Sequence, residues 1–241
     1  MGDVRVVSCS DQVALARETK RFLGEALASH PGRFVALAVG ESTLPLYARL
    51  DELAPGPDGS GPVALLAPSW AGRSIMPVDE LVPPPADPGR RFSARLADAL
   101  PAGLRDRLVP IDVDDDPELR AIELEARLRA QGLAAVVLGL GPDGHFAFNQ
   151  PPTPADAPAR VVPLAPANLF RLGDVDPSRA ALTLGVTTVL GAGSVLLIAF
   201  GQGKAEALDH LLHGPEDPAW PVTWLRRHPR LTVAVGPGLQ A

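Results

Sequence analysis

A glycine-rich turn near the middle of the chain constrains its fold more than any other feature. The turn follows an apolar run at residues 134–138 that predicts a short buried strand. It then places a carboxylate, Asp143, and an imidazole, His145, two residues apart. Glycines let the backbone turn sharply and approach a ligand closely, and in α/β enzymes side chains at the carboxyl end of a strand project together. The stretch at 134–151 therefore predicts a functional site.

The same turn matches the G-x-G-x-x-G fingerprint of dinucleotide-binding sites at residues 139–144. That fingerprint must open a crossover helix whose N-terminus holds the pyrophosphate. Pro151, Pro152 and Pro154 leave too little room for such a helix after Gly144. The sequence therefore argues against a dinucleotide cofactor.

Composition limits the class of protein and its partners. The 241 residues are 46% hydrophobic, enough to bury a large core in one α/β domain rather than two. A formal net charge of -6 offers no basic stripe for a nucleic-acid backbone, so a bound anion should be small and locally held. The single cysteine, Cys9, excludes an internal disulfide framework, and the sequence has neither a signal-peptide pattern nor an apolar run of membrane-spanning length. We expect a cytoplasmic, soluble protein with no nucleic-acid or membrane partner.

Two further glycine turns have the chemistry of anion-binding loops. Gly40 follows an apolar run at 33–39, and the hydroxyls of Ser42 and Thr43 precede a helix predicted at 46–50. The alternative is that one of these hydroxyls only caps the helix. The second turn, at 201–204, follows a predicted strand and ends in Lys204. A lysine at a helix N-terminus is unfavourable against the helix dipole unless an anion lies there, so Lys204 predicts a phosphate contact.

Two acidic clusters allow both a functional and a structural interpretation. Asp79 and Glu80 end an apolar segment, where sheet enzymes place catalytic groups, but adjacent acids are common on surfaces and these residues alone favour a solvated loop. The three aspartates at 114–116 have metal-ligand chemistry, but the favoured interpretation is a cap for the helix predicted at 117–131, with Pro117 at its first position.

Strand and helix patterns alternate along the chain. Strands are predicted at 4–7, 34–39, 63–67, 108–113, 134–138, 160–162, 195–200 and 231–235, and helices at 11–27, 46–50, 92–100, 117–131 and 204–212. This alternation predicts an α/β fold, a doubly wound and mainly parallel sheet with helices on both faces, in a single domain over residues 1–241. Ligands of such sheets bind at the carboxyl ends of the strands.

With these residues in view, the chain resembles the glucosamine-6-phosphate deaminase/isomerase family and, more distantly, the sister 6-phosphogluconolactonases. Residues 139–151 look like the family's G-x-G-x-D-G-H-x-A-F-N-E-P motif, and 201–207 look like its phosphate-binding G-x-x-K-A-x-A segment. Residues 78–80 fall where the family has M-D-E, and 224–229 are similar to its closing L-Q-x-H-P. The lactonases continue D-G-H-T-A-S-L-F-P, so residues 147–149 favour the deaminase branch, whereas 79–83 have some likeness to the lactonase D-E-R-x-V-P.

The resemblance implies an aldose–ketose isomerisation coupled to loss of ammonia, which converts an amino-sugar phosphate into a ketose phosphate. By resemblance, His145 opens the sugar ring with support from Asp143, and Asp79 moves a proton from C2 to C1. Gly40, Ser42, Thr43, Lys204 and Arg171 would hold the phosphate, so that binding of this remote group positions the reacting carbons. The resemblance implies a small sugar phosphate as partner, neither a metal nor an organic cofactor, and leaves a homo-oligomer open.

Three departures from the family pattern bear on the reaction. Gln150 stands where the family has glutamate, so a hydrogen bond to His145 would be kept without the charge that stabilises a protonated imidazole. Leu44 separates the threonine and proline that the family joins, and the segment at 165–178, which carries Arg171, is short and proline-rich. Three interpretations stay open: a hexosamine-phosphate deaminase/isomerase, which we favour, a sugar-phosphate lactone hydrolase with His145 as base, and a sugar-phosphate-binding regulator that has lost part of its acid-base set.

Overall fold

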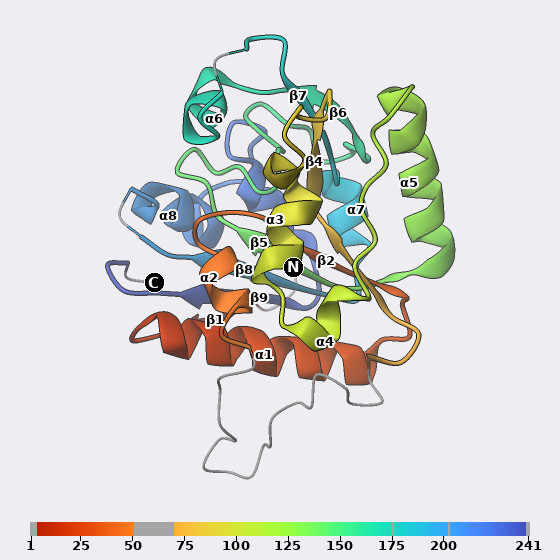
Figure 1. The fold of residues 1–241 in the computed structure, drawn as a ribbon. Helices are drawn as coiled ribbons and strands as arrows, with labels where there is room; N and C mark the ends of the chain where they lie inside the picture. The colour runs from red at the N-terminus through yellow and green to blue at the C-terminus, as the bar shows by residue number, and fades with distance from the viewer. Residues whose placement is uncertain (1–3, 51–69, 175, 202, 240–241) are drawn as a thin grey trace.

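Among the described residues, six parallel strands form the central sheet. They are β1 (Arg5–Ser8), β2 (Phe34–Leu37), β3 (Ser74–Pro77), β5 (Leu133–Gly139), β8 (Ser194–Ala199) and β9 (Leu231–Val235). In the computed structural model, which describes residues 4–50, 70–174, 176–201 and 203–239, they lie in the order β1-β9-β8-β5-β2-β3 (Figure 1). Every pairing in this sheet is parallel. The predicted parallel α/β sheet is confirmed.

Alternate residues of the central strands enter two separate cores. Val136 and Leu138 of β5 pack into one hydrophobic cluster and Val137 into the other, the period of two that a strand buried on both faces requires. Residues of α5 (Pro117–Gln131), α7 (Val186–Leu190), α8 (Ala205–His213) and the 3-10 helix η3 (Pro221–Arg227) belong to the first cluster. Residues of α1 (Gln12–Ser29), α2 (Leu44–Tyr47), α3 (Phe92–Ala99) and α4 (Ala102–Arg105) belong to the second. Helices therefore cover both faces, as the sequence predicted.

A second, antiparallel sheet was not predicted. It contains β4 (Asp79–Val82), β7 (Ala180–Thr183) and β6 (Arg160–Pro163) in that order, and α6 (Pro166–Arg171) lies between β6 and β7 in the chain. Val78 joins the two sheets, because its N–H donates to Leu37 of β2 at 3.2 Å and its carbonyl accepts from Leu184 at 3.0 Å. The second sheet therefore fixes β4, and with it Asp79, beside the main sheet.

Two predicted strands have different outcomes from the rest. Residues 108–113 do not form a strand: Leu108 makes an isolated bridge to Ile75, and the buried side chains of Ile111 and Val113 account for the apolar pattern. The strand predicted at 63–67 lies outside the described residues.

The acidic cluster before α5 caps that helix. Asp116 is its N-cap and accepts a hydrogen bond from the Leu119 N–H at 3.0 Å, with Pro117 at the first helical position. The capping interpretation is confirmed. In the same way, Asp11 caps α1 by accepting from the Ala14 N–H at 2.8 Å.

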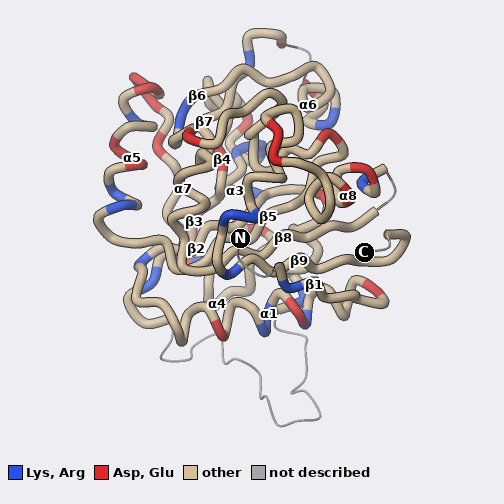
Figure 2. Tube along the Cα trace, turned by 180° about the vertical axis from the view of Figure 1, so that it is seen from behind, with Lys and Arg blue, Asp and Glu red and all other residues tan. Residues whose placement is uncertain are grey.

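Charge is mixed along the outer helices of the described part of the chain. Figure 2 shows acidic and basic positions interspersed along α5, which is the distribution expected of a solvated helix face. None of the helices among the described residues has both the length and the apolar character needed to cross a bilayer.

Candidate functional site

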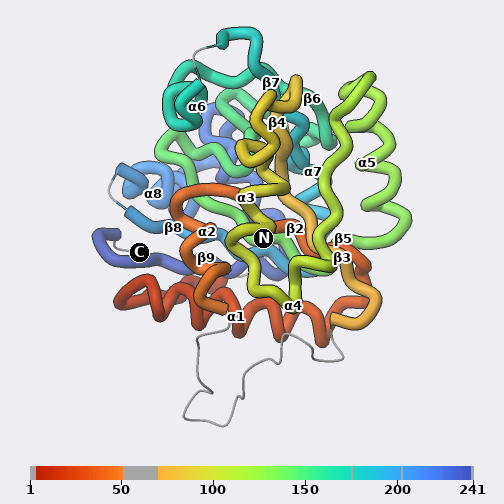
Figure 3. Tube along the Cα trace, in the orientation of Figure 1, coloured from red at the N-terminus to blue at the C-terminus, as the bar shows by residue number. Residues whose placement is uncertain are grey.

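A pocket lies where the strand order of the central sheet reverses. From β2 the chain continues to β3 on one side, whereas β5 pairs with β2 on the other side. Ligands of open α/β sheets bind at this kind of switch point, outside the carboxyl ends of the strands. The turns that follow β2, β5 and β8 meet there (Figure 3) and line a pocket of about 560 Å³ together with Asp79 and residues of α3 and α6.

The turn after β5 depends on glycine at two positions. A side chain at Gly141 would place its Cβ 2.2 Å from Nδ1 of His145, so only glycine lets the imidazole pack against the turn. Gly144 has a φ of +77° and faces Trp220 at close range. Residues 145–159 then form turns and extended chain, so the crossover helix of a dinucleotide fingerprint is replaced here by a loop. The prediction that no crossover helix follows Gly144 is confirmed.

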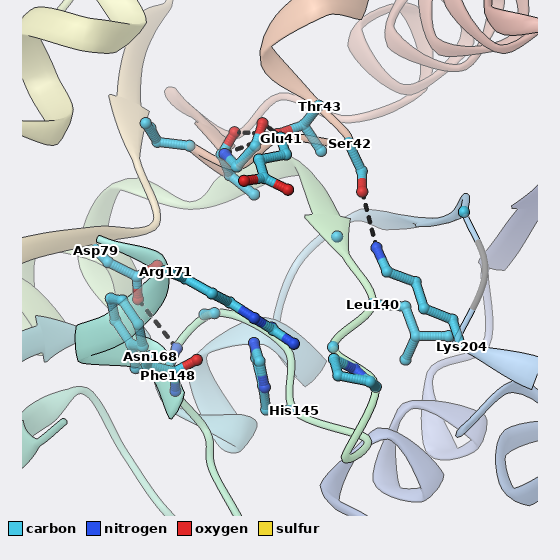
Figure 4. A pocket seen from close by; sticks show the side chains of 18 of the residues that line it. Glu41, Ser42, Thr43, Asp79, Leu140, His145, Phe148, Asn168, Arg171 and Lys204 are labelled. Atoms are coloured by element: carbon cyan, nitrogen blue, oxygen red, sulfur yellow. Dashed lines mark hydrogen bonds between the residues drawn. The ribbon is translucent and has the colours of Figure 1, made fainter. Parts of the chain in front are cut away.

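His145 and Asp143 form a pair. Asp143 Oδ1 lies 2.5 Å from His145 Nδ1, and the His145 side chain is 14% exposed. Burial raises the pKa of Asp143, but the hydrogen bond and the charge of His145 outweigh it and leave that pKa below its ordinary value. Because Nδ1 is engaged by a carboxylate, Nε2 is the ring nitrogen that remains for a ligand. His145 points into the pocket (Figure 4).

Asp79 also lines the pocket. It is the first residue of β4 and is 7% exposed, so the solvated-loop interpretation is wrong for this acid. Its Oδ1 accepts hydrogen bonds from the Thr183 hydroxyl and from the Phe148 N–H, the latter at 3.3 Å. Burial raises the pKa of Asp79 to about 7 although both hydrogen bonds act in the other direction. A carboxyl group with this pKa gives up and takes back a proton near neutral pH.

The neighbouring acid has a structural role. Glu80 is 1% exposed, and its carboxylate accepts hydrogen bonds from the Phe92 N–H at 2.9 Å and the Ser93 N–H at 3.0 Å. These are the first amides of α3, which otherwise has no side-chain cap. Successive residues of a strand point to opposite faces, so Asp79 faces the pocket while Glu80 holds α3.

The anion-binding turn after β2 differs in part from the prediction. Thr43 is fully buried, and its Oγ1 donates to the Ala38 carbonyl at 2.8 Å and accepts from the Gly40 N–H at 3.1 Å. The Thr43 hydroxyl and the Gly40 amide thus shape the turn, and Thr43 makes no side-chain cap for α2. Ser42 is the hydroxyl that faces the pocket, where its Oγ accepts a hydrogen bond from Lys204 Nζ at 2.8 Å.

Positive charge gathers at the same end of the pocket. Burial and the nearby charge of Arg171 lower the pKa of Lys204, and Glu41 acts in the opposite direction. Two neighbouring cations repel each other, and an anion bound between them would relieve that repulsion. Figure 4 shows Arg171 extending from α6 into the pocket, and Lys204 reaching Ser42. Lys204, Arg171, Asp79 and His145 therefore lie around one cavity.

Gln150 lies outside the pocket wall. Its amide makes hydrogen bonds to Pro163, Ala165 and Asn168, at the junction of β6 and α6. The expected hydrogen bond from this amide to His145 is therefore wrong, since both ends of the side chain bond to residues at the junction of β6 and α6. Asp143 is the acidic partner of His145.

Several residues of the site were not identified from the sequence. Thr183, Asn168, Glu41 and Arg95 are among them. Thr183 faces Asp79 only because β4 pairs antiparallel with β7, with Asp79 opposite Thr183. Of these four residues, Glu41 is the one that the sequence could have indicated, because it lies beside Ser42 within the predicted anion-binding turn.

Known proteins match almost the whole chain. The family described as glucosamine-6-phosphate isomerases/6-phosphogluconolactonase matches residues 11–233. A glucosamine-6-phosphate deaminase of Beutenbergia cavernae is 32% identical over 249 aligned residues, covering 97% of this chain and 89% of that protein. A glucosamine-6-phosphate deaminase of Bacillus thuringiensis is 37% identical over 144 residues, covering 58% of this chain and 54% of that protein.

Solved structures match the fold. A monomeric glucosamine-6-phosphate deaminase superposes with a TM-score of 0.79 at 22% identity, covering 97% of this chain and 98% of that one. The 6-phosphogluconolactonase of Trypanosoma brucei gives a TM-score of 0.75 at 19% identity, covering 98% of this chain and 97% of that one. At these identities the likeness establishes the fold, which the two activities share.

Proposed function

Because the chain belongs to the family of glucosamine-6-phosphate isomerases and 6-phosphogluconolactonases, we propose that it converts a hexosamine 6-phosphate, similar to glucosamine 6-phosphate, into a ketose 6-phosphate and ammonia. Membership confirms the resemblance inferred from the sequence motifs, and the family consists of sugar-phosphate enzymes. The finer assignment, deamination with isomerisation, is supported by the identity to deaminases along the chain and by the chemistry of the pocket.

The observation that carries the proposal is the presence of Asp79, His145 and Lys204 around one cavity. Isomerisation needs a base that removes a proton from C2 and returns it to C1 on one face of an enediol. Asp79 suits this role because burial raises its pKa to about 7, so that both protonation states are accessible at neutral pH. Its hydrogen bonds from Thr183 and Phe148 leave little freedom to the carboxylate, which favours a single proton-transfer geometry.

His145 is the proposed acid-base group for ring opening. This step moves a proton between the anomeric hydroxyl and the ring oxygen, and an imidazole can both donate and accept that proton. Asp143 fixes the ring through Nδ1 and directs Nε2 toward the ligand. The pair supplies both orientation and charge without a contribution from residue 150.

The cationic end of the pocket is the proposed phosphate site. Lys204 and Arg171 supply the charge, and Ser42 adds a hydroxyl to the same end. A phosphate held there is remote from the reacting carbons, so its binding energy serves to position C1 and C2 between Asp79 and His145.

Release of ammonium from glucosamine 6-phosphate tests the proposal directly. We expect ammonium and fructose 6-phosphate in equal amounts, and loss of turnover in Asp79→Asn with binding of the sugar phosphate retained. Asp98→Asn, an exposed acid of α3, is the matched control and should keep the parent rate. Acid release from 6-phosphogluconolactone without ammonium release would instead establish a lactonase, and tight binding without turnover of either compound would establish a regulator.

A further inference from the structure

We propose that Gln150 is a positioning residue: its amide ties the turn that carries His145 to α6, and so fixes the helix that presents Asn168 and Arg171 to the anionic end of the ligand. This inference rests on the proposed phosphate site at Lys204 and Arg171. It concerns a residue whose side chain lies behind the pocket wall and whose type departs from the family motif.

Three hydrogen bonds connect Gln150 to the start of α6. Its Oε1 accepts from the Ala165 N–H at 2.8 Å and from Asn168 Nδ2 at 2.7 Å, and its Nε2 donates to the Pro163 carbonyl at 2.9 Å. Pro163 ends β6, Ala165 is the N-cap of α6, and Asn168 lines the pocket. One side chain thus holds the end of a strand, the start of a helix and a pocket residue.

The other end of this connection is rigid. The neighbouring residue, Asn149, is fully buried, and its Nδ2 donates to the Leu184 carbonyl at 2.9 Å while its Oδ1 accepts from Arg160 Nη1 at 2.9 Å. The Gln150 N–H donates to the Phe148 carbonyl at 2.8 Å. Gln150 therefore links the turn that carries His145 to α6 through hydrogen bonds at both ends of the residue.

α6 needs such a connection. The helix has six residues, and its N-cap makes no side-chain hydrogen bond. A helix this short is marginal by itself, so its position depends on tertiary contacts. Leu169 packs into a small cluster with Leu164 and Phe148, but Phe170 is 85% exposed. The amide of Gln150 holds the N-terminal end of α6, while the Leu169 side chain and the hydrogen bond from Arg90 to the Leu172 carbonyl hold the rest of the helix.

The hydrogen-bond pattern calls for an amide rather than a carboxylate. One end of the side chain faces two donors and the other end faces a carbonyl oxygen. An amide has an acceptor end and a donor end, whereas an ionised carboxylate has acceptors only. In Gln150→Glu, a carboxylate oxygen would face the Pro163 carbonyl, two acceptors with no proton between them. Protonation of that carboxyl would restore a donor. The variant should therefore hold α6 at low pH and release it at high pH.

Binding of inorganic sulfate, whose charge is constant between pH 4 and 8, tests the inference by calorimetry. We expect Gln150→Leu to weaken binding about tenfold relative to the parent at pH 4 and at pH 8. Gln150→Glu should weaken it about tenfold at pH 8 and recover to within about twofold of the parent at pH 4, because a carboxyl group with the ordinary glutamate pKa of about 4.3 is mostly protonated there. Gln131→Glu, the same substitution at an exposed position at the end of α5, should follow the parent throughout.

Other charges around Gln150 do not reproduce this pattern. The cations on the neighbouring elements are arginines, Arg160 on β6, Arg171 on α6 and Arg179 between α6 and β7, and a guanidinium group does not lose its proton in this pH range. His145 is present in the parent and in the variants alike, so the ratio of variant to parent removes its effect. Hydrogen exchange of residues 164–172 in Gln150→Glu should rise from pH 4 to pH 8 after correction for the intrinsic rate, and this measurement monitors α6 even where sulfate binds weakly.

The outcomes separate this inference from the proposed function. If the parent does not bind sulfate, or if Lys204→Ala and Arg171→Ala bind it as tightly as the parent, the phosphate site is wrong. If those two variants bind weakly while Gln150→Leu and Gln150→Glu bind within twofold of the parent, the phosphate site stands and the positioning role of Gln150 is overturned. Equal weakening of Gln150→Glu at pH 4 and pH 8 overturns the donor-acceptor explanation.

Discussion

At the scale of single residues, Gly141 determines where the His145 imidazole lies. A Cβ at Gly141 would lie 2.2 Å from Nδ1, whereas a Cβ at Gly139, in the same turn, would have its nearest neighbour, Thr43 Cγ2, at 3.7 Å. We expect Gly141→Ala to displace the ring and lower kcat/KM about 100-fold. Gly139→Ala should remain within about threefold of the parent. Equal ammonium-release rates for the two variants would contradict the argument.

Thr183 should tune the acidity of Asp79. Its hydroxyl donates to the Asp79 carboxylate and favours the charged form, so it lowers a pKa that burial raises to about 7. Thr183→Val removes this donor and should move the acidic limb of the kcat/KM profile upward by about one pH unit. Thr183→Ser keeps the hydroxyl and should restore the parent profile. A lower rate with an unshifted profile in Thr183→Val would indicate a structural role only.

At the scale of elements, Glu80 links the second sheet to α3. Its buried carboxylate holds the Phe92 and Ser93 amides and the Ser93 hydroxyl, whereas Asp116 caps α5 at an exposed position. Loss of an exposed cap costs about 1 kcal/mol, and a buried group left without its partner costs about 1–3 kcal/mol more. We expect Glu80→Ala to lower the free energy of unfolding by roughly 2–4 kcal/mol in urea titration, clearly more than Asp116→Ala. Equal losses would mean that burial adds nothing to this cap.

The elements that the sequence predicted well are those whose residues carry the signal themselves. The continuous apolar runs of β2, β5 and β8 and the caps Asp11 and Asp116 are local features, and so was the glycine turn with Asp143 and His145. Long-range pairing leaves no such local signal. The antiparallel pairing of β4 brings together Asp79 and Thr183, which are 104 residues apart. The direction of the Gln150 amide depends on Asn168, 18 residues away on another element. A pair of adjacent acids therefore looked solvated although both are buried.

At the scale of the whole molecule, Asp79 should make stability fall as pH rises. The native pKa is about 7 against an ordinary value of 3.8, so between these values the folded protein binds a proton that the unfolded chain has lost. Unfolding then releases a proton, and the free energy of unfolding decreases with rising pH across this window and levels off above it. The folded state carries the full cost of a buried charge only above pH 7.

Asp79→Asn should therefore stabilise the protein while it abolishes turnover. The amide keeps the shape and an acceptor for Thr183 but never ionises, so the variant escapes the penalty that the parent incurs as pH rises. Since one pKa unit corresponds to about 1.4 kcal/mol, we expect its advantage in free energy of unfolding to grow by about 2–4 kcal/mol between pH 4.5 and pH 8. Urea titrations of both proteins at the two pH values measure this difference. A constant difference would show that Asp79 is not held near neutral pKa in the fold, and would remove the reason to assign it the proton transfer between C2 and C1.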